Sequence, residues 1–217
     1  MTNETIRAVL WDFGGVLTDS PFDAFRDYER AHGLPRDFIR SLNARDPDAN
    51  AWARFERSEI GLDEFDRAFA EEARIAGHAV HGRDVVKLLY GRIRPEMVQA
   101  LRRCASVYRN ACLTNNVNAG SGHGLPTSDQ RAAEVAQVLA MFDVVIESRK
   151  VGVRKPDPQF YRLALETLRI EPQQAVYLDD LGINLKPARA LGMHTIKVTD
   201  SASALAALEE VLDIPLR

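Results

Sequence analysis

Cysteine is scarce in this chain, and its scarcity excludes two classes of protein. Only Cys104 and Cys112 occur among the 217 residues. Two cysteines are too few for a disulfide framework, and no cluster of His and Cys has the spacing of zinc ligands. We therefore expect stability to come from an apolar core, in a reducing setting for which the cytoplasm is the default location.

Long apolar runs and an excess of basic charge are also absent. No stretch approaches the ~20 apolar residues that a membrane-spanning helix needs. The opening MTNETIRAVLWDFGG contains an apolar run only about half the ~7–15 residues of a secretory leader's core at best, and Asp12 ends it. The 28 Lys and Arg residues nearly balance 31 Asp and Glu, for a net charge of −3, whereas nucleic-acid-binding domains are usually basic. We expect neither a membrane nor a nucleic acid as partner.

What the chain does contain is an alternation of short apolar runs and helical patterns. Its hydrophobic fraction of 46% is ordinary for a globular protein. Five runs rich in β-branched or large residues are predicted strands: 6–11, 107–113, 144–147, 175–178 and 195–198. Asp157-Pro158 is a predicted helix start and Gly192 a predicted helix end. This alternation predicts an α/β fold with a parallel, Rossmann-like sheet covered on both faces.

The segment between the first two predicted strands indicates an insertion. It covers residues 12–106 and so exceeds the roughly 30 residues of a whole βαβ unit. Three apolar stripes at helical spacing lie within it: Phe22, Phe25 and Tyr28; Phe38, Ile39 and Leu42; and Leu62, Phe65, Phe69, Ala73 and Ala76, the last between Gly61 and Gly77. We predict a helical cap over 18–91, inserted into a core made of 1–17 and 92–217.

Residues suited to one reaction follow four of the predicted strands. They are Asp12, then Thr114-Asn115-Asn116, then Lys155-Pro156, then Asp179-Asp180. In open parallel sheets the carboxyl ends of the strands share one edge, where ligands bind. A carboxylate can attack phosphorus, oxygen ligands can hold a magnesium ion, and a lysine with a hydroxyl can bind the phosphate oxygens. The pattern therefore favours phosphoryl transfer.

The same residues resemble a known family. Asp12-Phe13-Gly14-Gly15-Val16-Leu17, Leu113-Thr114-Asn115, Lys155-Pro156 and Asp179-Asp180 with Asn184 are similar to the four ordered motifs of the haloacid dehalogenase superfamily. The position of the insertion matches the subgroup with a helical cap. From 142 to 197 the chain also resembles the N-terminal phosphatase domain of soluble epoxide hydrolases.

The resemblance implies a role for each matching residue. It implies that Asp12 is the nucleophile and a ligand of Mg²⁺, and that Lys155 bridges phosphate and nucleophile. The other implied roles are phosphate binding by Thr114, Asn115 and Asn116, metal binding by Asp180 and the Gly14 carbonyl, and support from Asp179 and Asn184. A small phosphorylated substrate is the implied partner.

Gly14 departs from the family pattern, which places an acid–base Asp two residues after the nucleophile in its phosphatases. General acid–base help contributes ~100- to 10,000-fold in rate. A phosphomonoesterase of reduced activity, or one acting on good leaving groups, is the leading interpretation. Asp19 is a nearby candidate for a substitute acid.

Two other functions stay open. A metal-independent dehalogenase would use the same nucleophile, although the Asp179-Asp180 pair is typical of the metal-dependent branch. A non-catalytic phosphate- or metal-binding protein would explain Gly14, although Asp12, Lys155 and Asp180 together favour chemistry. The composition of 118–128, NAGSGHGLPTS, predicts a loop, either lining the mouth of the site or simply exposed.

Overall fold

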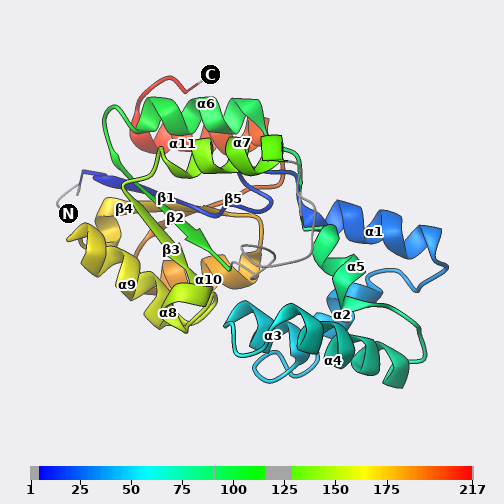
Figure 1. Ribbon diagram of the computed structural model, residues 1–217. Coiled ribbons are helices and arrows are strands. Elements are labelled where there is room, and N and C mark those ends of the chain that lie inside the picture. Colours follow the sequence, from blue (N-terminus) through cyan, green and yellow to red (C-terminus); the bar gives the residue numbers. More distant parts are fainter. Residues whose placement is uncertain (1–4, 90, 116–128, 217) are drawn as a thin grey trace.

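The core of the molecule is a five-stranded parallel sheet with the order β3-β2-β1-β4-β5 (Figure 1). The computed structural model describes residues 5–89, 91–115 and 129–216. The strands are β1 (Ala8–Trp11), β2 (Arg109–Thr114), β3 (Val144–Glu147), β4 (Ala175–Asp179) and β5 (His194–Lys197). The predicted Rossmann-like α/β class is confirmed, and each predicted strand begins or ends within two residues of an observed one. Asn116 and the predicted loop over 118–128 lie outside the described residues.

Helices cover both faces of this sheet, as expected for parallel strands (Figure 1). On one face lie α6 (Pro95–Cys104), α7 (Asp129–Leu139) and α11 (Ser201–Leu212), packed around Trp11. On the other lie α8 (Ser148–Val151), α9 (Pro158–Leu168) and α10 (Gly182–Leu191). Of these, α9 and α10 pack around Tyr177. A 3-10 turn, Pro172–Gln174, precedes β4. As predicted, Asp157 caps α9 through the Gln159 amide, and Gly192, with φ of 104°, ends α10.

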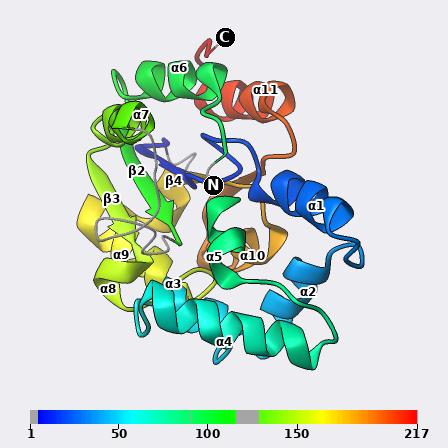
Figure 2. The ribbon, with the colours of Figure 1, turned by 45° about the vertical axis from the view of Figure 1, so that its right-hand side comes forward.

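A second group of helices lies between β1 and α6, next to the carboxyl ends of the strands (Figures 1 and 2). It consists of α1 (Pro21–Ala31), α2 (Phe38–Ala44), α3 (Ala51–Glu56), α4 (Leu62–Ile75) and α5 (Gly82–Lys87). These helices bury an apolar cluster of their own, in which Phe55 stacks on Phe65 with ring centroids 4.3 Å apart. The three predicted stripes fall on α1, α2 and α4.

Two adjacent segments join these helices to the sheet domain. Thr18 and Ile93 form an antiparallel bridge. The Asp19 amide donates to the Arg92 carbonyl at 2.8 Å, and the Arg94 amide donates to the Leu17 carbonyl at 2.9 Å. We therefore propose to divide the chain at this junction, with a cap over 18–91. Of the helices that the structure describes, none is both long enough and apolar enough to cross a membrane.

Candidate active site

The carboxyl ends of β1 and β4 bring the predicted catalytic residues together. Trp11 and Leu178, the residues before Asp12 and Asp179, are paired in register. The Asp12 amide donates to the Leu178 carbonyl at 2.9 Å, which fixes the two strand ends relative to each other. The strand register therefore places Asp12 beside the Asp179-Asp180 pair.

Lys155 lies at the centre of this group, and its side chain is buried. Its ammonium is 2.8 Å from Asp12 Oδ2 and 2.9 Å from Asp179 Oδ2. Burial alone would lower the pKa of Lys155, but the charges of Asp12 and Asp179 outweigh it and raise that pKa. Lys155 is therefore a cation in the site.

Asp179 is fully buried, and both of its carboxylate oxygens are occupied. Oδ1 accepts from the Leu181 amide at 2.8 Å and from Asn184 Nδ2 at 3.1 Å. Oδ2 accepts from Lys155, from Asn184 and from the Tyr177 hydroxyl. With these donors in place, Asp179 is engaged in positioning Lys155 rather than facing a ligand.

Asn115 holds the backbone of Lys155 from the other side. Its Nδ2 donates to the Lys155 carbonyl at 2.9 Å, and its Oδ1 accepts from the Lys155 amide at 2.8 Å. Asn115, which follows β2, thus fixes the backbone of Lys155, which follows β3 in the chain. Thr114 ends β2 half-buried, at the same edge of the sheet.

Asp12, Asp179 and Asp180 each offer an oxygen within 4.8 Å of the others. Two of these three carboxylates, Asp12 and Asp179, pair with the Lys155 ammonium. Burial and the neighbouring Asp179 charge raise the pKa of Asp180 to about 6. Burial, opposed by Lys155, also raises the pKa of Asp12. This concentration of negative charge suits a divalent cation, and hard oxygen ligands are those that Mg²⁺ prefers. Because Asp179 is fully engaged, Asp12 and Asp180 are the carboxylates that fit it.

The two glycines after Asp12 differ in their surroundings. Gly15 has φ of 76°, and a Cβ built on it would lie 2.3 Å from Asp180 Oδ2. Gly14 lies outside the left-handed region, and a Cβ there would meet nothing within 4 Å. The absence of a side chain thus lets Asp180 approach at Gly15, whereas the backbone does not require glycine at Gly14.

Asp19, the candidate substitute acid, is engaged at the cap junction. Its oxygens lie 3.2 Å from Arg92 Nε and 3.6 Å from Arg94 Nε. These contacts hold it as the counter-ion of two guanidinium groups. The next residue, Ser20, donates to Asp180 Oδ2 at 3.2 Å and so links the cap to the acidic cluster.

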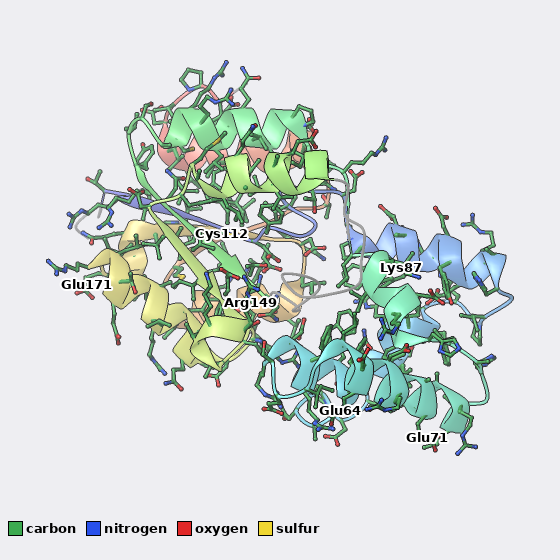
Figure 3. The ribbon with its side chains drawn as sticks, in the orientation of Figure 1. Glu64, Glu71, Lys87, Cys112, Arg149 and Glu171 are labelled. Atoms are coloured by element: carbon green, nitrogen blue, oxygen red, sulfur yellow. The ribbon has the colours of Figure 1, made fainter. Side chains whose placement is uncertain are left out.

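The two cysteines take no part in this site. Both are free and buried, and burial raises the pKa of Cys104 to about 12 and the pKa of Cys112 further. Cys112 lies within the sheet (Figure 3). Neither thiol is therefore a nucleophile at neutral pH.

Sequence reasoning missed three polar side chains in this region: Ser20, Tyr161 and Tyr177. Tyr177 carried a usable signal, because residues two apart on a strand share a face, which puts its hydroxyl beside Asp179. Tyr161, which donates to the Asn184 carbonyl at 2.8 Å, and Ser20 come from distant segments. No local sequence pattern predicts the contacts of Tyr161 and Ser20.

Comparison with known sequences matches residues 6–192 to the model of the haloacid dehalogenase-like hydrolase family. The chain is 37% identical to acyl-CoA dehydrogenase family member 10 of Mus musculus over 97% of its own length and 19% of the relative. It is 33% identical to bifunctional epoxide hydrolase 2 of Sus scrofa, over 97% of its own length and 40% of the relative. The chain thus spans less than half of either protein.

One relative of similar size is named as a phosphatase. The chain is 29% identical to phosphatase MT3486 of Mycobacterium tuberculosis, over 91% of its own length and 89% of the relative. Among solved structures, a haloacid dehalogenase family enzyme of Bacteroides thetaiotaomicron, in complex with magnesium and inorganic phosphate, matches with a TM-score of 0.61 at 20% identity. That match covers 91% of this chain and 98% of the other. At this identity the structural likeness supports the fold.

Proposed function

Because this chain belongs to the haloacid dehalogenase-like hydrolases, we propose that it is a magnesium-dependent phosphomonoesterase acting through an aspartyl-phosphate on Asp12. The observation that carries the proposal is the contact of Lys155 with both Asp12 and Asp179, with an oxygen of Asp180 within 4.8 Å of both carboxylates. That set supplies a nucleophile, a phosphate-binding cation and metal ligands in one place. The similarity to a relative named as a phosphatase supports the same activity.

The proposed metal ligands are Asp12, Asp180 and the Gly14 carbonyl. When bound there, Mg²⁺ would neutralise phosphate oxygens and make the phosphorus more electrophilic. Gly15 keeps the space that the Asp180 carboxylate occupies. Asn184 and Tyr177 donate hydrogen bonds to Asp179, which in turn positions Lys155.

In the proposed reaction, a carboxylate oxygen of Asp12 attacks phosphorus and the P–O bond to the leaving group breaks. The Lys155 ammonium balances the negative charge on the phosphoryl oxygens as they move toward Asp12, a preorganised electrostatic effect. The Thr114 hydroxyl and the segment after it, with Asn115 and Asn116, are the proposed phosphate contacts. Water then attacks the aspartyl-phosphate, which restores Asp12 and releases inorganic phosphate.

The leaving oxygen receives no proton from position 14, because Gly14 has no side chain. The Asp19 carboxylate pairs with Arg92 and Arg94. We therefore propose that the chain acts best on small phosphate esters whose leaving groups are stable as anions.

A panel of phosphate esters, assayed with Mg²⁺ and with a chelator, tests this function. We expect phosphate release with Mg²⁺, its loss with the chelator and its return when Mg²⁺ is restored. Halide release from a haloacid in the presence of the chelator would instead identify a dehalogenase. Binding of phosphate with no turnover of any ester would identify a non-catalytic protein.

Replacing Gly14 with aspartate is expected to supply the missing acid. The position has room for a Cβ and no positive φ, so the variant should fold and melt like the parent. We expect about a tenfold or larger gain on an alkyl phosphate, and a smaller gain on p-nitrophenyl phosphate, since a general acid matters most for a basic leaving group. The measurement is the rate ratio of variant to parent for each ester.

Gly14→Asn is the matched control for this prediction, because it adds a side chain of similar shape without an acid. It should give no selective gain on the alkyl ester. Equal gains of Gly14→Asp on both esters would mean that position 14 does not face the leaving group.

A further inference from the structure

A buried charged pair joins the cap to the core beside the catalytic lysine. Glu56 is the last residue of α3, and only 8% of its side chain is exposed. Its carboxylate accepts a hydrogen bond from Arg154, a core residue. Arg154 immediately precedes Lys155 in the chain, so this contact connects the cap directly to the segment that carries the lysine.

Two further hydrogen bonds cross at the same place. The Ser148 hydroxyl, at the start of α8, donates to the Glu56 carbonyl at 2.9 Å. The second terminal nitrogen of Arg154 donates to the Pro47 carbonyl at 2.5 Å. Helices α3 and α8 accordingly lie side by side in both ribbon views (Figures 1 and 2). The Arg154 guanidinium thus donates hydrogen bonds to two cap residues, Glu56 and Pro47. A lysine could not reproduce this forked geometry.

This pair differs from the other ion pairs of the cap. Arg54 and Glu64, 3.0 Å apart, both belong to the cap and have side chains 39% and 51% exposed. Glu64 lies on the side of the cap away from the sheet (Figure 3). Exposed ion pairs of this kind contribute little to the stability of the fold. A buried carboxylate that loses its charged partner, by contrast, destabilises the fold. Burial raises the pKa of Glu56, an effect that Arg154 opposes.

Lys155 is consequently held from two directions. Asp12 and Asp179 fix its ammonium. Asn115 fixes its backbone on the core side, and the residue before it is anchored to the cap. If the cap moves away, Arg154 loses its bonds to Glu56 and Pro47 together.

We propose that Glu56 is a positioning residue, which latches the cap onto the Arg154-Lys155 segment and so couples the position of the cap to the position of the catalytic ammonium. The reaction it assists is the proposed phosphomonoester hydrolysis, on which this inference rests. Glu56 does not touch the reacting atoms; it acts through Arg154.

The test compares Glu56→Gln with Glu64→Gln, which removes a charge from the same cap without touching the core. Hydrogen–deuterium exchange of residues 148–157 is the readout that a purely local role in the cap would not move. We expect faster exchange in this core segment for Glu56→Gln and no change for Glu64→Gln. We also expect kcat/KM for p-nitrophenyl phosphate to fall by about tenfold or more, since small displacements of catalytic groups are costly.

Two more variants keep the test decisive if Glu56→Gln folds poorly. Ser148→Ala removes one hydroxyl and should speed exchange in the same segment. In a double-mutant cycle of Glu56→Gln and Arg154→Gln, the double variant should lose about as much kcat/KM as Arg154→Gln alone, because Arg154→Gln already removes the interaction with Glu56.

The latch would be overturned if Glu56→Gln exchanged over 148–157 at the rate of the parent. Its kcat/KM would then also lie within about twofold of that of Glu64→Gln, as for a substitution at a surface site. The proposed function fails separately. If the parent hydrolyses no phosphate ester, that function is wrong, while the exchange comparison still decides whether Glu56 couples the cap to the lysine segment.

Discussion

Replacing Asp12 with asparagine is expected to reduce phosphate release by at least about 1,000-fold, because an amide cannot act as the nucleophile and covalent catalysis has no substitute in this site. The fold should persist. Asp12 has an oxygen within 4.8 Å of oxygens of two other carboxylates, Asp179 and Asp180, so removing its charge reduces the repulsion among them. We expect a melting temperature equal to or above that of the parent in metal-free buffer, with turnover measured as inorganic phosphate.

Asp19→Asn is the matched control, since it also exchanges a carboxylate for an amide near the strand ends. Its side chain pairs with Arg92 and Arg94, so the variant should lose far less activity than Asp12→Asn. Near-parental turnover by pure Asp12→Asn would contradict the assignment of the nucleophile. Loss of turnover by Asp19→Asn alone would identify Asp19 as the working acid.

Gly15→Ala is expected to remove Mg²⁺-dependent activity, with a loss of about 100-fold or more from displacement of a site group. The added Cβ would lie 2.3 Å from Asp180 Oδ2, on a backbone with φ of 76°. Asp180 must then move away from the position in which it lies beside Asp12. Titration calorimetry with Mg²⁺ should show weakened binding, alongside the lost phosphate release.

Gly14→Ala provides the comparison for this variant. It adds the same methyl group one residue earlier, where the Cβ meets nothing within 4 Å, and it should bind Mg²⁺ like the parent. If Gly15→Ala bound Mg²⁺ as tightly as Gly14→Ala does, the position of Asp180 would not govern the metal site.

The sheet and the cluster of polar residues at its carboxyl edge were predictable because their signals are local and repeated. The predicted strands are short runs rich in β-branched or large residues, and candidate site residues follow four of them, as Asp12 follows β1. The stripe from Leu62 to Ala76 between two glycines likewise predicted α4 closely. By contrast, α3 and α5 have six residues each, fewer than two turns, and therefore show no periodic pattern.

The contacts within the site were less predictable, because they join distant segments. The resemblance to a motif implies that Asn115 binds phosphate, but it does not indicate that the Asn115 side chain also bridges the backbone of Lys155, 40 residues away. Glu56 and Arg154 are 98 residues apart, and neither stands in a pattern that marks a partner. The sequence also does not show whether Gly14 has a positive φ, and the effect of replacing it depends on that angle.

Trapping the covalent intermediate tests the central claim most directly. The protein is mixed with Mg²⁺ and a phosphate ester, quenched during turnover and treated with borohydride, which reduces an aspartyl-phosphate to homoserine. Peptide mapping by mass spectrometry then locates the modified residue. We expect homoserine at position 12, dependent on both Mg²⁺ and substrate. Homoserine at another position, or sustained turnover with Asp12 never modified, would contradict it.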